Sequence, residues 1–145
     1  MDFYGDNIMV FHGHQRISPS IVDDAVTDVF ILASHVHREP SDNSCLYHSL
    51  CSGLQRCSLN VKMTSTSLRS DINFFISSHG SSVISLGPSV RSTISDAITQ
   101  CADCSLDRYI INQSNQRSWG GIIEIATCVV MYPVNIYVFR PIPGS

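Results

Sequence analysis

Charge is scarce in this chain, and positive charge is scarcest. Only 14% of its 145 residues are charged, and nine basic residues against twelve acidic ones give a formal net charge of −3 at pH 7. Proteins that bind nucleic acid or anionic membranes through electrostatics carry clustered arginine and lysine and a high isoelectric point. The sequence pI of about 6.0 gives no such basis, so we expect no nucleic-acid partner and no membrane partner.

Long apolar runs and a basic leader are also missing. No uninterrupted apolar stretch approaches the roughly 20 residues that a membrane-spanning helix needs. Acidic rather than basic residues precede the first apolar run, Ile8 to Phe11, and this differs from a secretory signal peptide. We therefore expect a cytoplasmic protein, and we expect it to be a monomer.

The six cysteines do not indicate disulfides or a metal site. Without a secretory signal, an even number of cysteines does not imply disulfide bonds. Cys101 and Cys104 form one C-x-x-C pair, whereas a zinc site needs a second ligand pair at recognisable spacing. Two alternating histidine pairs are expected to be surface or cap residues rather than ligands: His12 with His14, and His35 with His37. We expect no metal and no cofactor.

The chain contains enough apolar material for one domain. Hydrophobic residues make up 43% of it, and no repeat or internal boundary divides residues 1–145. Residues 1–19 are expected to form a loose N-terminal arm with one short strand. Most of the remainder shows helical spacing, and residues 134–139 alternate as a strand does. Helices are predicted at 21–33, 45–57, 68–78, 93–101, 107–111 and 122–132, with a loop at 81–88. In the helix at 93–101, Ile94, Ile98 and Cys101 are expected to face inward. Residues 112–118 are polar and are expected to be exposed. The fold class is therefore α/β (α+β), with a small central sheet flanked by helices.

One cysteine, Cys45, lies where a helix is predicted to begin. Asp42 and Ser44 before it are both favoured N-cap residues, and leucines follow at four-residue spacing as far as Leu54. A helix N-terminus favours anions, and the thiolate is the nucleophilic form of cysteine. The alternative is a small buried apolar side chain, which is the commonest role of a free cysteine. Spacing alone favours the buried role.

A second distinctive stretch is Trp119-Gly120-Gly121, which leads into an apolar helix that Pro133 ends. This helix is apolar on almost every side, so we expect it to be central. Glu124 is its one charged residue, and a buried carboxylate must be paired or hydrogen-bonded. A tryptophan beside a glycine turn is also compatible with a simple core aromatic.

Taken together, these stretches resemble the ovarian-tumour (OTU) family of cysteine deubiquitinases. Members typically read Asp-Gly-Asn-Cys-Leu-Phe/Tyr at the nucleophile and Trp-Gly-Gly-x-x-Glu-Leu later. This chain reads Asp-Asn-Ser-Cys-Leu-Tyr from Asp42 and Trp-Gly-Gly-Ile-Ile-Glu-Ile from Trp119. Between them, residues 68–76 are similar to the family's Leu-Arg-x-x-(apolar)-x-x-(aromatic)-(apolar) helix. The resemblance runs in the family's order from about Ser34 to Phe139, and it implies a papain-like OTU-type architecture.

The resemblance implies roles for the residues around the nucleophile. Cys45 would attack the isopeptide carbonyl, and backbone N–H groups of residues 42–45 would form the oxyanion hole. Asp42 would help to orient the base, a role compatible with capping the helix. Asn43 replaces the family's glycine and tolerates a left-handed conformation. Ser44 replaces the family's asparagine and can still donate one hydrogen bond.

The same resemblance places the Trp119-Gly120-Gly121 turn along the substrate channel. It implies a thiol-dependent hydrolase of ubiquitin (iso)peptide bonds, with ubiquitin or a ubiquitin-like protein as partner. The alternatives are a catalytically inactive OTU-like domain that binds ubiquitin or acts as a scaffold, and an unrelated helical domain.

The chain departs from the family at the general base. In the family a histidine follows the strand after the Trp-Gly-Gly helix, but here no histidine follows His79. The chain is then a fragment, or an inactive homologue, or it takes a base from elsewhere. The candidates for such a base are His12, His14, His35, His37 and His79. We favour the fragment and the inactive homologue over a rearranged base.

Overall fold

The computed structural model describes residues 8–13, 44–57, 62–87, 89–118 and 120–139. The described elements, in chain order, are β1 (Ile8–Gly13), α1 (Cys45–Arg56), α2 (Ser65–Ser78), β2 (Val83–Gly87), β3 (Val90–Thr93), α3 (Ile94–Ala102), α4 (Leu106–Gln113), α5 (Ile122–Met131) and β4 (Val134–Phe139). This mixture of helices and short antiparallel strands confirms the α+β class. The strand expected in the N-terminal arm is β1. The helix predicted at 21–33 lies outside the described residues.

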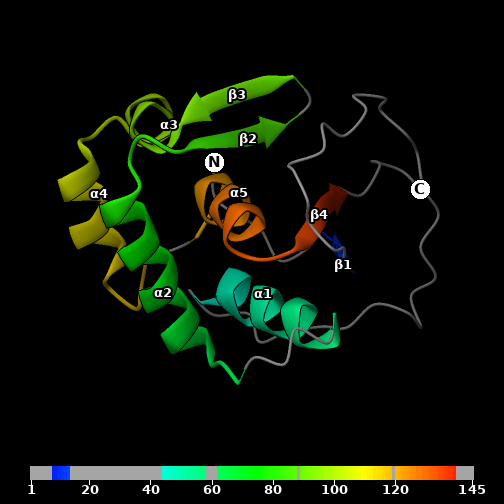
Figure 1. Ribbon diagram of the computed structural model, residues 1–145. Coiled ribbons are helices and arrows are strands. Elements are labelled where there is room, and N and C mark those ends of the chain that lie inside the picture. Colours follow the sequence, from blue (N-terminus) through cyan, green and yellow to red (C-terminus); the bar gives the residue numbers. More distant parts are fainter. Residues whose placement is uncertain (1–7, 14–43, 58–61, 88, 119, 140–145) are drawn as a thin grey trace, which may run out of the picture.

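Helix α5 lies at the centre of the fold. Its neighbours include α2, α3, β2 and β4, and Figure 1 shows α1 on one side of it and the β2–β3 hairpin on the other. Ile123, Ala126 and Cys128 are all buried, as the nearly all-apolar sequence predicts. Pro133 follows the helix, and β4 begins at the next residue.

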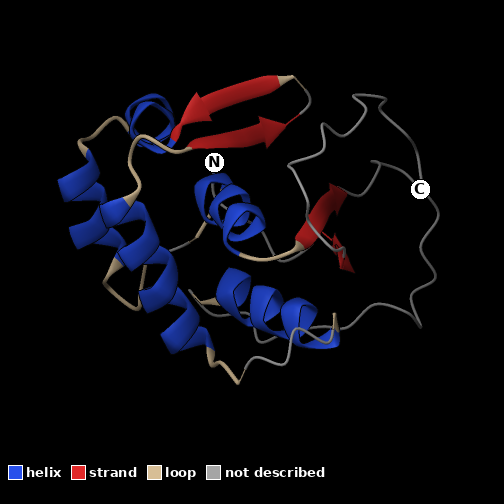
Figure 2. Cartoon of the chain, in the orientation of Figure 1, coloured by secondary structure: helices blue, strands red, loops and turns tan. Residues whose placement is uncertain are grey.

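The strands of the described residues form two separate antiparallel pairs, which Figure 2 shows on different sides of α5. Strand β1 pairs with β4 from Ile8 opposite Phe139 to Gly13 opposite Val134. Strand β2 pairs with β3, with an irregularity between Ser85 and Gly87. In this part of the chain the centre is therefore a helix rather than a sheet.

The hairpin corrects the prediction of a loop at 81–88. Of the residues of β2, only Ile84 is fully buried, against α5, while Val83 is 56% exposed. A strand this short that buries one side chain gives almost no alternation to detect. The reversal itself uses left-handed backbone, with Gly87 at φ 146° and Ser89 at φ 57°.

Two helix details also differ from prediction. Helix α2 begins at Ser65 rather than 68, because Thr64 and Ser67 cap each other reciprocally: the Ser67 N–H donates to the Thr64 hydroxyl oxygen, and the Thr64 N–H donates to the Ser67 hydroxyl oxygen. Cys101 was expected to face inward with Ile94 and Ile98, but it is exposed in the last turn of α3.

Candidate functional site

Cys45 is the first residue of α1, as predicted. Ser44 is its N-cap residue, but the Ser44 side chain makes no capping bond to the helix. The Ser44 hydroxyl instead donates to the carbonyl oxygen of Gln116, at 3.4 Å. Because Cys45 is the first helical residue, its thiol lies near the positive end of the helix dipole. The Cys45 side chain is only 5% exposed. Asp42 and Asn43 lie outside the described residues.

The glycine turn lies directly against this end of α1. A Cβ atom added to Gly120 would lie 2.5 Å from Leu46 Cδ2 and 3.2 Å from Tyr47 Cε2. A side chain at this position would therefore require the Leu46 side chain to shift. Two segments more than seventy positions apart in the chain thus lie side by side, and the first two helical residues after Cys45 form the contact. Trp119 lies outside the described residues.

A buried arginine holds these two segments together. Arg69, on α2, is 1% exposed. Its guanidinium donates to the carbonyl oxygens of Gln113 at 3.0 Å, Ser118 at 2.9 Å and Gln116 at 3.4 Å, and to the Ser44 hydroxyl at 3.2 Å. One cation thus bonds both the residue before Cys45 and the segment that leads to the glycine turn. The planar fork of arginine suits this task, because lysine has a single ammonium centre.

The Tyr47 ring packs against the Arg69 guanidinium. The Arg69 guanidinium carbon lies 4.1 Å from the centroid of the Tyr47 ring, which is a cation–π distance. The Tyr47 hydroxyl donates to Gln113 Oε1 at 3.0 Å. Burial, reinforced by the Glu124 carboxylate, raises the pKa of Tyr47, so this hydroxyl keeps its proton and remains a donor.

Glu124 fixes the other end of the turn. It is fully buried, and its carboxylate accepts from the Tyr109 hydroxyl at 2.5 Å and from the Gly121 N–H at 2.7 Å. This confirms that the one carboxylate of the apolar helix is hydrogen-bonded. Burial raises the pKa of Glu124, and these two hydrogen bonds act in the opposite direction. The Gly121 N–H is thus oriented by a side chain in the first turn of α5.

The sequence did not predict the burial of Gln113 or the hydrogen bonds that Arg69 makes to the two segments. Residues 112–118 were predicted to be polar and exposed, yet α4 runs to Gln113 and this side chain is 8% exposed. The sequence does contain a signal for this burial: Gln113 lies four residues after Tyr109, and this spacing places both side chains on the inner face of α4.

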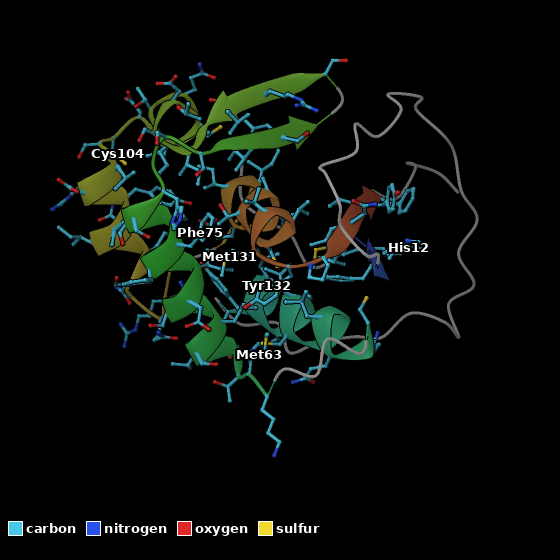
Figure 3. The ribbon with its side chains drawn as sticks, viewed as in Figure 1. His12, Met63, Phe75, Cys104, Met131 and Tyr132 are labelled. Carbon is cyan, nitrogen blue, oxygen red and sulfur yellow. The ribbon has the colours of Figure 1, made fainter. Side chains whose placement is uncertain are left out.

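Two of the candidate histidines lie away from Cys45. His12 is on β1, which crosses the opposite end of α1: Phe11 occupies the space beside Gly53, and Gly13 lies against Cys57. From Cys45 to Gly53 the helix rises about 12 Å. Figure 3 shows His12 on the β1–β4 side of the molecule.

His79 follows the last turn of α2. Its ring stacks on Phe75 with centroids 4.0 Å apart, and Nδ1 lies 3.1 Å from the Phe75 carbonyl oxygen. It lies ten residues beyond Arg69, about 15 Å along the helix. His48 lies one turn into α1, where its backbone N–H donates to the Ser44 carbonyl. His14, His35 and His37 are outside the described residues.

A cavity of about 250 Å³ borders the glycine turn at Gly121. Its walls include Gly121, Glu124, Tyr109 and the two cysteines Cys101 and Cys104. Within the described ranges, no three histidine, cysteine or acidic side chains come together as metal ligands. No helix in the same part of the chain is long and apolar enough to cross a membrane.

Comparison of the chain with protein-family models, curated proteins and solved structures gives no match.

Proposed function

We propose that the chain is an OTU-like thiol hydrolase of ubiquitin or ubiquitin-like (iso)peptide bonds, with Cys45 as nucleophile. The observation that carries the proposal is the bonding of Arg69 to both Ser44 and Ser118. The three stretches that resemble the family are far apart in sequence, and in the fold they meet at one place. A chance resemblance of three short motifs gives no reason for them to converge.

The proposed reaction uses the position of Cys45 at the start of α1. The thiolate attacks the carbonyl carbon of the scissile bond, and backbone N–H groups of residues 42–45 stabilise the oxyanion. The C–N bond then breaks, the amine leaves with a proton, and water hydrolyses the thioester. Gly120 lies against Leu46 at the start of α1, so the glycine turn would border the extended C-terminal tail of ubiquitin near the nucleophile. We further propose a cytoplasmic monomer.

A second function is favoured by two observations. Cys45 is 5% exposed, and His12 and His79 are placed away from it. A buried thiol with neither His12 nor His79 beside it fits a catalytically inactive domain that binds ubiquitin through the same surface. Loss of a positioned base reduces the rate by roughly 10²–10⁴-fold, so the two functions differ in turnover rather than in partner.

A ubiquitin probe with a thiol-reactive group at its C-terminus separates these functions. The hydrolase proposal predicts one covalent adduct by intact mass, located on Cys45 and absent from Cys45→Ala. The matched control is Cys57→Ala, at the other end of α1, which should keep the adduct. Binding of ubiquitin without an adduct indicates the inactive domain. An adduct that persists in Cys45→Ala, or no binding at all, overturns the proposal.

A further inference from the structure

Arg69 carries a positive charge into the interior of the fold. Among the described residues it is the one lysine, arginine or histidine whose side chain is buried. The hydrogen bonds of its guanidinium in that part of the chain go to neutral oxygens, three carbonyls and one hydroxyl. These bonds orient the cation without cancelling its charge. A desolvated charge that neutral groups hold in place acts strongly on ionisable groups nearby.

The guanidinium lies against residues on both sides of Cys45. Arg69 Nη2 is 3.2 Å from the Ser44 hydroxyl oxygen, and Ser44 directly precedes Cys45. The guanidinium carbon is 4.1 Å from the ring centroid of Tyr47, which follows Cys45 by two residues. Covalent geometry from the Ser44 hydroxyl to the Cys45 sulfur then limits the distance between Nη2 and that sulfur to about 12 Å. Because Arg69 is buried, salt screens this interaction less than one at the surface.

The size of the effect follows from Coulomb's law. At about 12 Å and an effective dielectric constant of about 20, a unit positive charge shifts the ionisation midpoint of a thiol by about one pH unit. The positive end of α1 acts on Cys45 in the same direction. Burial of the sulfur opposes both, because it disfavours the charged form. Of these three contributions, the charge of Arg69 is the one that a single substitution removes.

We propose that Arg69 is a positioning residue for the Cys45 nucleophile, and that its fixed charge stabilises the thiolate relative to the neutral thiol. This inference rests on the proposed function, because it concerns the same sulfur. Arginine keeps its proton in proteins, so Arg69 does not act as a base and the proton of the thiol leaves to solvent. A neighbouring arginine, lysine or protonated histidine favours a thiolate in the same way.

The other titratable groups around α1 are the same in every variant of residue 69. They include Tyr47 and His48 on α1, Asp71 on α2, His12 on β1 and Glu124 on α5. His12 and Asp71 are exposed, so water screens their charges. Burial raises the pKa of Glu124, which favours its neutral form, and Tyr47 keeps its proton. A difference between two variants of residue 69 therefore reports on that residue.

The pH dependence of Cys45 alkylation in the full-length chain tests the inference. The thiolate displaces iodide from iodoacetamide and forms a carbon–sulfur bond, so the rate follows the thiolate fraction. Trypsin releases Cys45 on the peptide 39–56, and fragmentation in the mass spectrometer separates its alkylation from that of Cys51. We expect the unmodified chain to reach half its maximal rate below about pH 8.5, the ordinary value for cysteine.

Variants separate the charge of Arg69 from its hydrogen bonds. Arg69→Met should raise the midpoint by about one pH unit, and Arg69→Gln serves as the neutral variant if Arg69→Met loses the far-ultraviolet circular dichroism of the fold. Arg69→Lys breaks several of the same hydrogen bonds but keeps a positive charge, so its midpoint should stay close to that of the unmodified chain. The matched control is Gly53→Ala, which crowds the other end of α1 without a change of charge and should leave the midpoint in place.

The inference is overturned if the neutral variant keeps the midpoint of the unmodified chain, or if Arg69→Lys moves it as far as the neutral variant does. A midpoint of the unmodified chain at or above about pH 8.5 also overturns it. Alkylation needs no ubiquitin. Midpoints that follow the predicted pattern in a chain that binds no ubiquitin would therefore overturn the proposed function and leave the charge effect in place. Equal midpoints in a chain that the ubiquitin probe labels would overturn this inference alone.

Discussion

Replacement of Arg69 by methionine is predicted to loosen the junction between α1 and the glycine turn. Methionine keeps most of the apolar stem and removes the guanidinium. The three carbonyl oxygens of Gln113, Gln116 and Ser118 and the Ser44 hydroxyl then lose a charged donor. Hydrogen bonds to charged groups contribute about 1.5–3 kcal/mol each, and contributions at one side chain are not additive.

Removal of a desolvated charge offsets part of this loss. We expect Arg69→Met to lower the free energy of unfolding by about 3 kcal/mol, a large share of the 5–15 kcal/mol typical of a domain. With a urea m-value of about 2 kcal/mol/M, the midpoint should fall by about 1.5 M. The urea midpoint of Arg69→Lys should lie between those of the unmodified chain and Arg69→Met, because one ammonium cannot reach all four acceptors.

Urea denaturation followed by far-ultraviolet circular dichroism measures this effect. The matched control is Arg108→Met on the exposed face of α4, which should change stability by no more than about 0.5 kcal/mol. If Arg69→Met shifts the midpoint no further than Arg108→Met does, Arg69 does not hold the two segments together.

Three further predictions concern close contacts and a buried carboxylate. Gly53→Ala would place a Cβ atom 2.2 Å from the Phe11 ring, so we expect it to lower the free energy of unfolding in urea by about 1–3 kcal/mol. The effect of Gly53→Ala should be smaller in a chain that also carries Phe11→Leu. Strictly additive effects of the two substitutions would contradict the contact. Gly120→Ala should lower the free energy of unfolding by a similar amount, about 1–3 kcal/mol, because its Cβ would meet Leu46. The control is Gly13→Ala, whose Cβ would have its nearest neighbour at 3.4 Å. It should lower the free energy of unfolding less in the same assay. Burial raises the pKa of Glu124 above its ordinary value of 4.5, so folding favours the protonated form. The free energy of unfolding of the unmodified chain, measured relative to that of Glu124→Gln, should therefore fall as pH rises from about 4 through the folded-state pKa. An increase of this relative stability with pH would contradict the raised pKa.

The sequence predicted best those features that strong local signals control. Pro133 ends α5, and apolar alternation then marks β4 over Val134–Phe139 as observed. The cluster of cap-forming residues before Cys45 identified the start of α1. The continuous apolar surface of α5 correctly indicated the central element. Each of these signals lies within a few residues of the feature that it predicts.

Features that depend on distant residues were not predicted. Strand β2 exists because Ile84 packs on α5 and the strand pairs with β3, although its own alternation is too short to detect. The sequence showed Arg69 only as part of a family-like pattern. Its four bonding partners lie 25 to 49 positions away, so its task at the site emerges only in the folded chain.

The central claim is that the start of α1 and the glycine turn form one ubiquitin-binding surface. Peptide-resolved hydrogen–deuterium exchange of Cys45→Ala, with and without ubiquitin, tests it most directly, whether or not the chain turns over substrate. We predict that ubiquitin slows exchange in residues 44–48 and in residues 116–122 together, and leaves the β2–β3 hairpin unchanged. Slowed exchange in only one of the two segments, or in neither, would contradict the claim.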